Sequence, residues 1–327
     1  MKQDIYFEEN YGKLYEVTEN GKAEIFKYQD DNGAISNQFL KREIPIKINN
    51  ETYYDIVTPY GYGGPVIEQC NNKQELLKKY EEEFLKYCEK NKIVSEFIRF
   101  HPIIKNALDF KDIYEVIYLR KTLGTDLEKY EDPYAKEFSK SCRKNIRQCK
   151  NKGITYKVNV APRDISKFKD IYYSTMDRNN ATDYYYFGDE YFNKILQYFP
   201  ENIITVEAIY EDKTIAMGLY FIYNKILHIH LSGTLSEYLY LSPAYMLRYG
   251  ATIWAKENGY RLIHHGGGRS NSDTDSLYLF KKNFAKNTDF DFYIGKKIWN
   301  KEIYDKLCNL KGIKDDGGYF PAYRKES

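Results

Sequence analysis

The spacing of apolar and polar side chains predicts alternating groups of strands and helices. In the first 60 residues, short segments rich in β-forming residues are separated by turn signals such as Asn20-Gly21. They predict strands over residues 13–18, 23–28, 42–48 and 52–58. A glycine-rich loop, Tyr60–Pro65, follows. Helical spacing of apolar residues then predicts a helix over 73–90, with strands over 93–100 and 115–119.

The second half repeats this order of elements. Helices are predicted over 164–178 and 189–198, and an antiparallel meander over 203–210, 214–222 and 226–231. A long helix is expected to begin at Ser242 as N-cap with Pro243 in its first turn, and to end before Gly259. A strand over 262–265 follows. The matching order in both halves predicts a duplicated α/β unit.

Between the two halves lies a segment with a one-sided distribution of charge. Asp132-Pro133 predicts the start of a helix that runs to Asn151. Its basic residues recur at spacings of four and three and form one stripe, with Lys144 beside it: Lys136, Lys140, Arg143, Arg147 and Lys150. A solvated basic face and a phosphate-binding surface are both compatible with this pattern.

Composition narrows the class of protein. The formal net charge is +2, from 49 basic and 47 acidic side chains, so the chain as a whole carries no signal for a polyanion partner. No apolar run is long enough to cross a bilayer, and the amino-terminal residues lack an apolar signal core. Five cysteines without a CxxC pair favour reduced thiols. We therefore expect a cytoplasmic protein without a transmembrane segment.

The most informative stretch runs from Leu262 to Phe284. A short apolar strand leads into Gly266, Gly267 and Gly268, then a polar loop and a short helix that carries Phe280 and Lys281. Glycines after a strand let the backbone approach a ligand closely. A lysine held opposite such a strand end suits stabilisation of an oxyanion or phosphate. A tight turn before an ordinary amphipathic helix is the alternative.

Two other kinds of site are compatible with parts of the sequence. His228 and His230 share one strand face, and His264-His265 follow later, but a zinc site requires three ligands with outer partners. A polar wall of a substrate cleft is the preferred interpretation, so no metal is predicted. The segment Tyr240–Ala244, before the long helix, has no glycine where a CoA-binding turn would need one, which disfavours a standard CoA site.

The chain resembles the Fem family of peptidoglycan-bridge aminoacyltransferases (FemABX) and their GNAT-like relatives. The resemblance extends over nearly the whole chain, and its carriers are the segments 60–65, 143–147, 173–178, 207–234, 255–259 and 266–284. It implies an α/β (α+β) fold of two tandem GNAT-like domains, each a mixed, mostly antiparallel sheet flanked by helices. The domains are expected at residues 1–150 and 151–327, the second carrying the catalytic lysine.

The resemblance also implies an activity. Members of this family transfer an amino acid from aminoacyl-tRNA to an amine of a nucleotide- or lipid-linked wall precursor, without a further cofactor. Peripheral contact with the inner membrane face is expected for such acceptors. The family's catalytic lysine follows a phenylalanine, which corresponds to Lys281 after Phe280. Two departures concern the acceptor site: His101 precedes Pro102 where the family has an acid, and Gly63-Gly64-Pro65 lacks the family's arginine.

The predicted site residues fall into three groups. Lys281 and Phe280 are the catalytic candidates. The acceptor candidates are Tyr62, Gly63, Gly64, Arg99, His101, Arg178 and His230, with Arg99 and His101 expected to alternate on one strand. The donor candidates are Arg143, Lys144, Arg147, Gly267 and Gly268. An acyl-CoA-dependent N-acyltransferase acting on an amino sugar, and a non-enzymatic module that binds RNA or an envelope precursor, are the alternatives.

Overall fold

The computed structural model describes residues 4–272, 274–314 and 317–325. The chain forms two compact units, one made of residues 1–119 with 291–327 and the other of residues 120–290. Strand β6 (Glu115–Asp126) leads from the first unit into the second, and β12 (Asp289–Ile298) leads back. This division differs from the predicted boundary at residue 150, because the basic segment belongs to the second unit and the C-terminal segment returns to the first.

The first unit contains a mixed sheet in the strand order β1-β2-β3-β5-β12, with β4 paired to β2. Its other strands are β1 (Gly21–Asp30), β2 (Gly33–Glu43), β3 (Tyr54–Val57), β4 (Val66–Cys70) and β5 (Ile93–Arg99). Only β3 and β5 pair in parallel among these described strands. Helix α2 (Lys73–Lys90) packs on β1, β2 and β5 through Leu76, Tyr80, Phe84 and Cys88, as its apolar spacing predicts.

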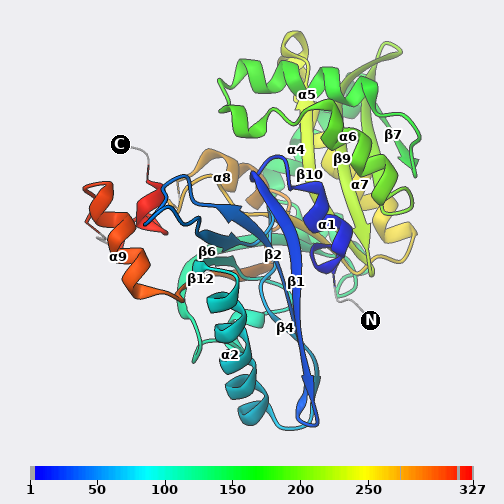
Figure 1. Ribbon diagram of the computed structural model, residues 1–327. Coiled ribbons are helices and arrows are strands. Elements are labelled where there is room, and N and C mark those ends of the chain that lie inside the picture. The colour runs from blue at the N-terminus through cyan, green and yellow to red at the C-terminus, as the bar shows by residue number, and fades with distance from the viewer. Residues whose placement is uncertain (1–3, 273, 315–316, 326–327) are drawn as a thin grey trace. The chain divides into compact units, whose positions relative to one another are not determined.

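The second unit contains a sheet in the order β6-β11-β10-β9-β8-β7. Its remaining strands are β7 (Thr155–Val160), β8 (Ile203–Tyr210), β9 (Lys213–Tyr223), β10 (Ile226–Thr234) and β11 (Leu262–Gly266). Strands β10 and β11 are parallel, and the other pairs are antiparallel. Helix α7 (Ala244–Glu257) packs on β7 to β10, and α5 (Ser166–Arg178) packs on β9 and β10 (Figure 1). The predicted meander and fold class are confirmed.

The remaining elements are short helices and one C-terminal helix. The α-helices are α1 (Glu9–Leu14), α3 (Pro133–Glu137), α4 (Lys140–Asn151), α6 (Asp189–Tyr198), α8 (Ser276–Lys282) and α9 (Lys301–Leu310). The 3₁₀ helices are η1 (Ile5–Phe7), η2 (Asn106–Leu108), η3 (Asp183–Tyr185), η4 (Ser236–Leu241) and η5 (Ala322–Arg324). Among the described residues, no helix has the length and apolar character that a membrane span requires.

Three local predictions were wrong. The strand expected at 13–18 is replaced by α1 and a series of turns, because Tyr11 and Leu14 bury one helical face. The strand expected at 42–48 ends at Glu43, where β2 ends. The single basic helix breaks after Glu137, because Ser139 caps a new helix: its Oγ accepts a hydrogen bond from the amide of Cys142 at 3.0 Å.

Candidate active site

The candidate site lies where β11 ends in the second unit. Gly266 closes the strand with φ of +72°, a conformation that glycine adopts without a steric penalty. The next carbonyl, that of Gly267, accepts a hydrogen bond from Nζ of Lys281 at 2.7 Å. The structure therefore brings together Gly267 and the catalytic candidate Lys281, which the sequence assigned to one site.

Asp275 organises the loop between Gly268 and helix α8. Its Oδ1 accepts the amide of Tyr278 at 2.8 Å and caps the helix, while Oδ2 accepts the amides of Arg269 and Ser270, both at 3.0 Å. The hydrogen bond from the Tyr278 amide is the largest cause that lowers the pKa of Asp275 to about 2. Because all these bonds go to one carboxylate, Asp275 fixes the path of the backbone before Lys281.

Arg120 holds the same loop from strand β6. Its Nη1 donates to the carbonyl of Gly268 at 2.9 Å and to that of Ser270 at 3.0 Å. A Cβ on Gly268 would lie 2.6 Å from Oδ1 of Asp275. Any residue other than glycine at this position would therefore displace the Asp275 side chain. Neither Arg120 nor Asp275 was identified from the sequence. Asp275 sits one position before a short amphipathic helix, and this N-cap signal was available.

Lys281 occupies an electropositive environment. Burial is the main cause that lowers the pKa of Lys281 to about 7, and the positive charges of Arg248 and Arg120 lower it further, against an opposing effect of Asp275. Its side chain keeps partial contact with solvent. At neutral pH both the protonated and the neutral form of this amine are therefore populated, whereas an ordinary surface lysine is almost entirely protonated.

Phe280, the residue before Lys281 on α8, packs against two aromatic rings. Its ring lies 5.5 Å from that of Tyr245 on α7 and 5.2 Å from that of Phe284, both edge-on. These contacts tie α8 to α7 and to the buried core of the second unit. Phe280 therefore serves to position the helix that carries Lys281.

The adjacent histidines of β11 point to opposite faces of the sheet, as residue alternation in a strand requires. The ring of His264 lies 5.6 Å from that of His228 on β10, and its Nε2 lies 3.1 Å from Oγ1 of Thr122. His265 instead places Nε2 2.8 Å from Oγ1 of Thr125. Among the described residues, no group of three or more metal-binding side chains is present.

Two acceptor candidates, His230 and Arg178, engage the helices that pack on β9 and β10. Nε2 of His230 lies 2.6 Å from the hydroxyl of Tyr191, and burial followed by the charge of His228 lowers the pKa of His230 to about 3. Nη1 of Arg178 donates to the carbonyl of Thr234 at 2.8 Å. These contacts connect α5 and α6 with β10, and His230 stays neutral at physiological pH.

The other acceptor candidates form a group within the first unit. The amide of Gly63 donates to the carbonyl of Arg99 at 2.8 Å, and the Tyr62 ring lies edge-on to that of His101 at 5.8 Å. Gly64 has φ of +83°, and a Cβ there would lie 2.5 Å from Cγ2 of Ile98. The loop is therefore close-packed on the end of β5 and tolerates only glycine at this position.

Arg99 and His101 differ in their surroundings. Strand β5 ends at Arg99, so the expected alternation of both residues along one strand is not observed. His101 has 0 % exposed surface, and its Nε2 lies 3.3 Å from Oδ2 of the equally buried Asp4. Arg99 remains partly exposed and donates from Nη1 to the carbonyl of Thr58 at 3.1 Å. Arg99 can contact a ligand at the surface, whereas His101 supports the loop from within.

The basic stripe is divided between α3 and α4, and its members differ in availability. Nη1 of Arg143 donates to the carbonyls of Ala135 (2.8 Å) and Phe138, so this side chain closes the break between the helices. Nζ of Lys150 donates to the Tyr249 hydroxyl at 2.8 Å. The exposed stripe residues are Lys136, Lys140, Arg147 and Lys150, together with the flanking Lys144.

Glu137 does not neutralise this basic surface. Its carboxylate is 0 % exposed and accepts hydrogen bonds from the amide of Asn287 at 2.9 Å and from the hydroxyl of Thr288. Glu137, the only acid of the predicted basic run, therefore uses its carboxylate for hydrogen bonds in the protein interior. The exposed cations of α3 and α4 consequently remain a net positive surface.

The start of α7 bears on the question of CoA. Pro243 occupies the N-cap position without a side-chain hydrogen bond, and Ser242, the predicted cap, adopts φ of +56°. The amides of Tyr245 and Met246 already donate to the carbonyls of Ser242 and Pro243, at 3.2 and 2.9 Å. A pyrophosphate bound at a helix start needs such amides to be available, so this helix start is poorly suited to hold one.

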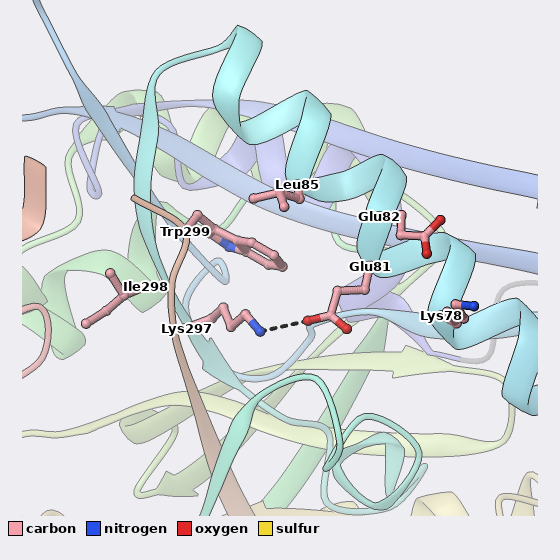
Figure 2. A pocket seen from close by; sticks show the side chains of 7 residues that line it. All are labelled: Lys78, Glu81, Glu82, Leu85, Lys297, Ile298 and Trp299. Atoms are coloured by element: carbon pink, nitrogen blue, oxygen red, sulfur yellow. Dashed lines mark hydrogen bonds and ion pairs between the residues drawn. The ribbon is translucent and has the colours of Figure 1, made fainter. Parts of the chain in front are cut away.

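A pocket of about 380 Å³ lies in the first unit, between α2 and β12 (Figure 2). Its lining residues are Lys78, Glu81, Glu82, Leu85, Lys297, Ile298 and Trp299. Nζ of Lys297 pairs with Oε1 of Glu81 at 2.8 Å across it. None of the predicted site residues lines this pocket, and it belongs to a different unit from Lys281.

Comparisons with known proteins concern the fold of the chain. Residues 136–274 match the family model described as an acetyltransferase (GNAT) domain. The structure is similar to that of FemX, with a TM-score of 0.69 and 13% identity over 93% of this chain and 94% of FemX. No curated protein matches the chain in sequence.

Two further structures share the fold. One is L-PGS from Bacillus licheniformis, with a TM-score of 0.54 and 13% identity over 95% of this chain and 97% of that chain. The other is the C-terminal domain of a putative lysylphosphatidylglycerol synthetase from Agrobacterium fabrum, with a TM-score of 0.59 and 11% identity over 94% and 92% of the two chains. The chain therefore has a FemX-like fold in which residues 136–274 match a GNAT acetyltransferase domain, as the resemblance in its sequence implied.

Proposed function

We propose that this protein is an aminoacyltransferase that moves an aminoacyl group from aminoacyl-tRNA to an amine of a nucleotide- or lipid-linked cell-envelope precursor. The observation that carries the proposal is the environment of Lys281. Its amine is held by the Gly267 carbonyl at the end of β11, and its pKa is lowered to about 7. Such a group can present a positive charge to a reacting carbonyl and can exchange a proton at neutral pH.

The reaction follows from elementary chemistry. The acceptor nitrogen attacks the ester carbonyl carbon, a C–N bond forms and the C–O bond to the ribose breaks. The amine proton ends on the departing ribose oxygen. In the tetrahedral intermediate the former carbonyl oxygen carries negative charge, and one donor aimed at it is worth about 2.7–4 kcal/mol. Lys281 in its protonated form supplies that donor, and no enzyme nucleophile is required.

The basic surface of α3 and α4 supports tRNA as donor. Five cations are exposed, and Lys150 among them donates to the Tyr249 hydroxyl, which leaves those at positions 136, 140, 144 and 147. If each contacts one phosphate, the logarithm of the binding constant falls against the logarithm of salt concentration with a slope of about −2.8 to −3.6. The names of similar structures support amino acid transfer in general: one is a putative lysylphosphatidylglycerol synthetase and another is FemX.

The acceptor site is proposed at the exposed part of the loop and strand end, around Tyr62 and Arg99, with the buried Gly64 supporting the loop. The guanidinium of Arg99 is partly exposed and suits a diphosphate-linked precursor. Titration calorimetry with the nucleotide-linked precursor should show weaker binding for Arg99→Ala than for wild type. Equal affinities would remove Arg99 from the acceptor site.

The second candidate function is acyl-CoA-dependent N-acylation of an amino sugar. It is favoured by the match of residues 136–274 to an acetyltransferase domain. It is opposed by the start of α7, where the amides of Tyr245 and Met246 are already bonded within the turn.

One experiment separates the two candidates. Purified protein is offered charged tRNA or acyl-CoA, together with nucleotide-linked and lipid-linked wall precursors, and products are identified by mass spectrometry. We expect an aminoacylated precursor from charged tRNA alone. The variant Lys281→Met should lower kcat by about 10²-fold or more. Product formation from acyl-CoA but not from tRNA would replace the proposed function with the second one.

A further inference from the structure

Helix α7 buries a guanidinium beside the candidate site. Arg248 is 7% exposed, and its Cζ lies 5.7 Å from the centre of the Tyr220 ring. Within the described part of the chain, its Nη1 has no hydrogen-bond partner and no carboxylate pairs with the side chain. An arginine stays protonated at any physiological pH, so this charge is permanent. Burial of an uncompensated charge is strongly unfavourable unless a bound group supplies the missing hydrogen-bond acceptor or the opposite charge.

A second buried polar atom without a partner belongs to His265. The hydroxyl of Thr125 donates to the carbonyl of Phe284 at 2.7 Å, so toward His265 it can only accept. Nε2 of His265 therefore carries the proton shared with Thr125 at 2.8 Å, and Nδ1 is a bare acceptor. His265 is 1% exposed, and Nδ1 has no hydrogen-bond partner among the residues described. Burial and the charges of Arg248 and Lys281 hold the pKa of His265 well below its usual range, which keeps it neutral.

The fold gathers these groups around one set of aromatic rings. Tyr245 precedes Arg248 by three residues on α7, so both side chains share a helical face. The Tyr245 ring lies 5.5 Å from that of Phe284, and the His265 ring lies 6.1 Å from the same Phe284. Gly266, Gly267 and Lys281 are partly exposed, so the protein surface begins next to this group.

The two buried atoms without a hydrogen-bond partner, Nη1 of Arg248 and Nδ1 of His265, have opposite hydrogen-bonding roles. Arg248 offers a donor with positive charge, which suits a carbonyl oxygen or oxyanion, and His265 offers an acceptor, which suits an N–H group. An α-aminoacyl group has both features, with the oxygen and the nitrogen three bonds apart, whereas an acetyl group has only the carbonyl. Positive surroundings also favour the uncharged form of a bound amine, as they do for Lys281.

We propose that Arg248 and His265 form the subsite that recognises the α-aminoacyl group of the donor: Nη1 of Arg248 binds the acyl oxygen together with Lys281, and Nδ1 of His265 accepts the α-amino N–H. This inference rests on the proposed function and names the residues that select an aminoacyl over a simple acyl donor. A site built to bond a substrate N–H discriminates strongly against an analogue that lacks it, because its buried acceptor is then left unsatisfied.

The test compares alanyl and propanoyl donors that differ only by the α-amino group. With the same tRNA, wild type should prefer the alanyl donor in kcat/KM by about 10²-fold or more. His265→Phe, which removes the acceptor, should lose this preference by lowering the alanyl rate alone. His265→Asn, which retains an oxygen near the position of Nδ1, should keep part of it. Arg248→Met should lower both rates equally. Equal loss of both donors in the His265 variants would overturn the assignment of the α-amino subsite.

A binding measurement separates this proposal from the proposed function. The probes are 3′-alanylamido-3′-deoxyadenosine and its propanoyl counterpart, which do not turn over. Calorimetry should show tighter binding of the alanyl probe to wild type and equal binding of both probes to His265→Phe. Absence of transfer to any acceptor together with this binding difference would refute the transferase reaction but keep the subsite. Equal binding of both probes to wild type would refute the subsite whatever the activity.

Discussion

Replacement of Lys281 by methionine should stabilise the protein, and the gain should depend on pH. In the folded state the pKa of Lys281 is lowered to about 7 from its usual 10.5, first by burial and then by Arg248 and Arg120. In the unfolded chain the amine regains its ordinary pKa. The folded state therefore disfavours the charged form, and this penalty is fully present below about pH 7. It declines as pH rises from 7 toward 10.5, and it vanishes above that value.

The magnitude follows from the size of the shift. One pKa unit corresponds to about 1.4 kcal/mol, so the displacement of Lys281 has an upper bound of about 5 kcal/mol. Solvent reaches part of the side chain and reduces this figure. Methionine also loses the hydrogen bond to the Gly267 carbonyl, worth about 1 kcal/mol. We expect a net gain of about 1–3 kcal/mol in the free energy of unfolding at pH 6, decreasing toward zero near pH 10.

Urea unfolding followed by circular dichroism at pH 6, 7, 8, 9 and 10 measures this difference directly. The matched control is Lys282→Met on the same helix, since Nζ of Lys282 lies 3.7 Å from Oδ2 of Asp289 and its loss removes a favourable pair. The control should change stability by less than about 1 kcal/mol at every pH. A Lys281→Met variant that is destabilised, or whose difference from wild type stays constant from pH 6 to 10, would refute the electrostatic account of the site.

Three further changes test other parts of the molecule. Replacing Lys144 and Arg147 together by alanine should remove two phosphate contacts. The slope of log binding constant for tRNA against log salt concentration should then become less steep by about 1.4–1.8, and an unchanged slope would exclude this surface from tRNA contact. Asp55→Asn should lower the free energy of unfolding by about 2–4 kcal/mol, measured in urea, because it breaks a buried ion pair. Glu96→Gln should stabilise the fold more at pH 8 than at pH 4.5, because burial raises the pKa of Glu96 to about 7. The cost of its charge in the folded state begins above pH 4.5 and is complete above about pH 7, so a pH-independent effect would contradict this account.

Elements whose periodicity is long and uninterrupted could be predicted from the sequence. The bounds of α2 and α6 match those predicted, because each carries several apolar residues on one face. The basic run from Pro133 was misread because charge spacing persisted across the break at Phe138 and Ser139. Phe138 is fully buried there and packs edge-on to Phe284 at 5.2 Å. A tertiary contact of this kind leaves no local signal.

The candidate site was predictable only where its parts are close in sequence. Gly267 and Lys281 lie on one strand–loop–helix segment, so their proximity could be inferred, and the structure joins them directly. Arg120 reaches the same loop from β6, nearly 150 positions away along the chain, and no pattern in a single sequence encodes that pairing. Arg248 did leave a signal: it is a lone charge within the apolar stretch of α7, between Leu247 and Ala251.

Asp55 and Lys281 are charged groups whose surroundings predict opposite effects of mutation. Both carboxylate oxygens of Asp55 have partners. The side chain pairs with Arg42 at 2.9 Å and Arg324 at 2.6 Å, and it accepts a hydrogen bond from the Tyr323 hydroxyl at 3.2 Å. Such a group stabilises the fold, and its removal should destabilise. Lys281 lies among positive neighbours, so its charged form opposes folding.

Selection for stability alone would remove a lysine such as Lys281 and would retain an aspartate such as Asp55. A charge that persists at a cost to folding is explained when a ligand completes its interactions, since the ligand's binding energy then offsets that cost. The contrast in sign between Asp55→Asn and Lys281→Met therefore tests the functional argument without knowledge of the substrate. If both variants were destabilised alike, the surroundings of Lys281 would be structural, and the case for an active site there would fail.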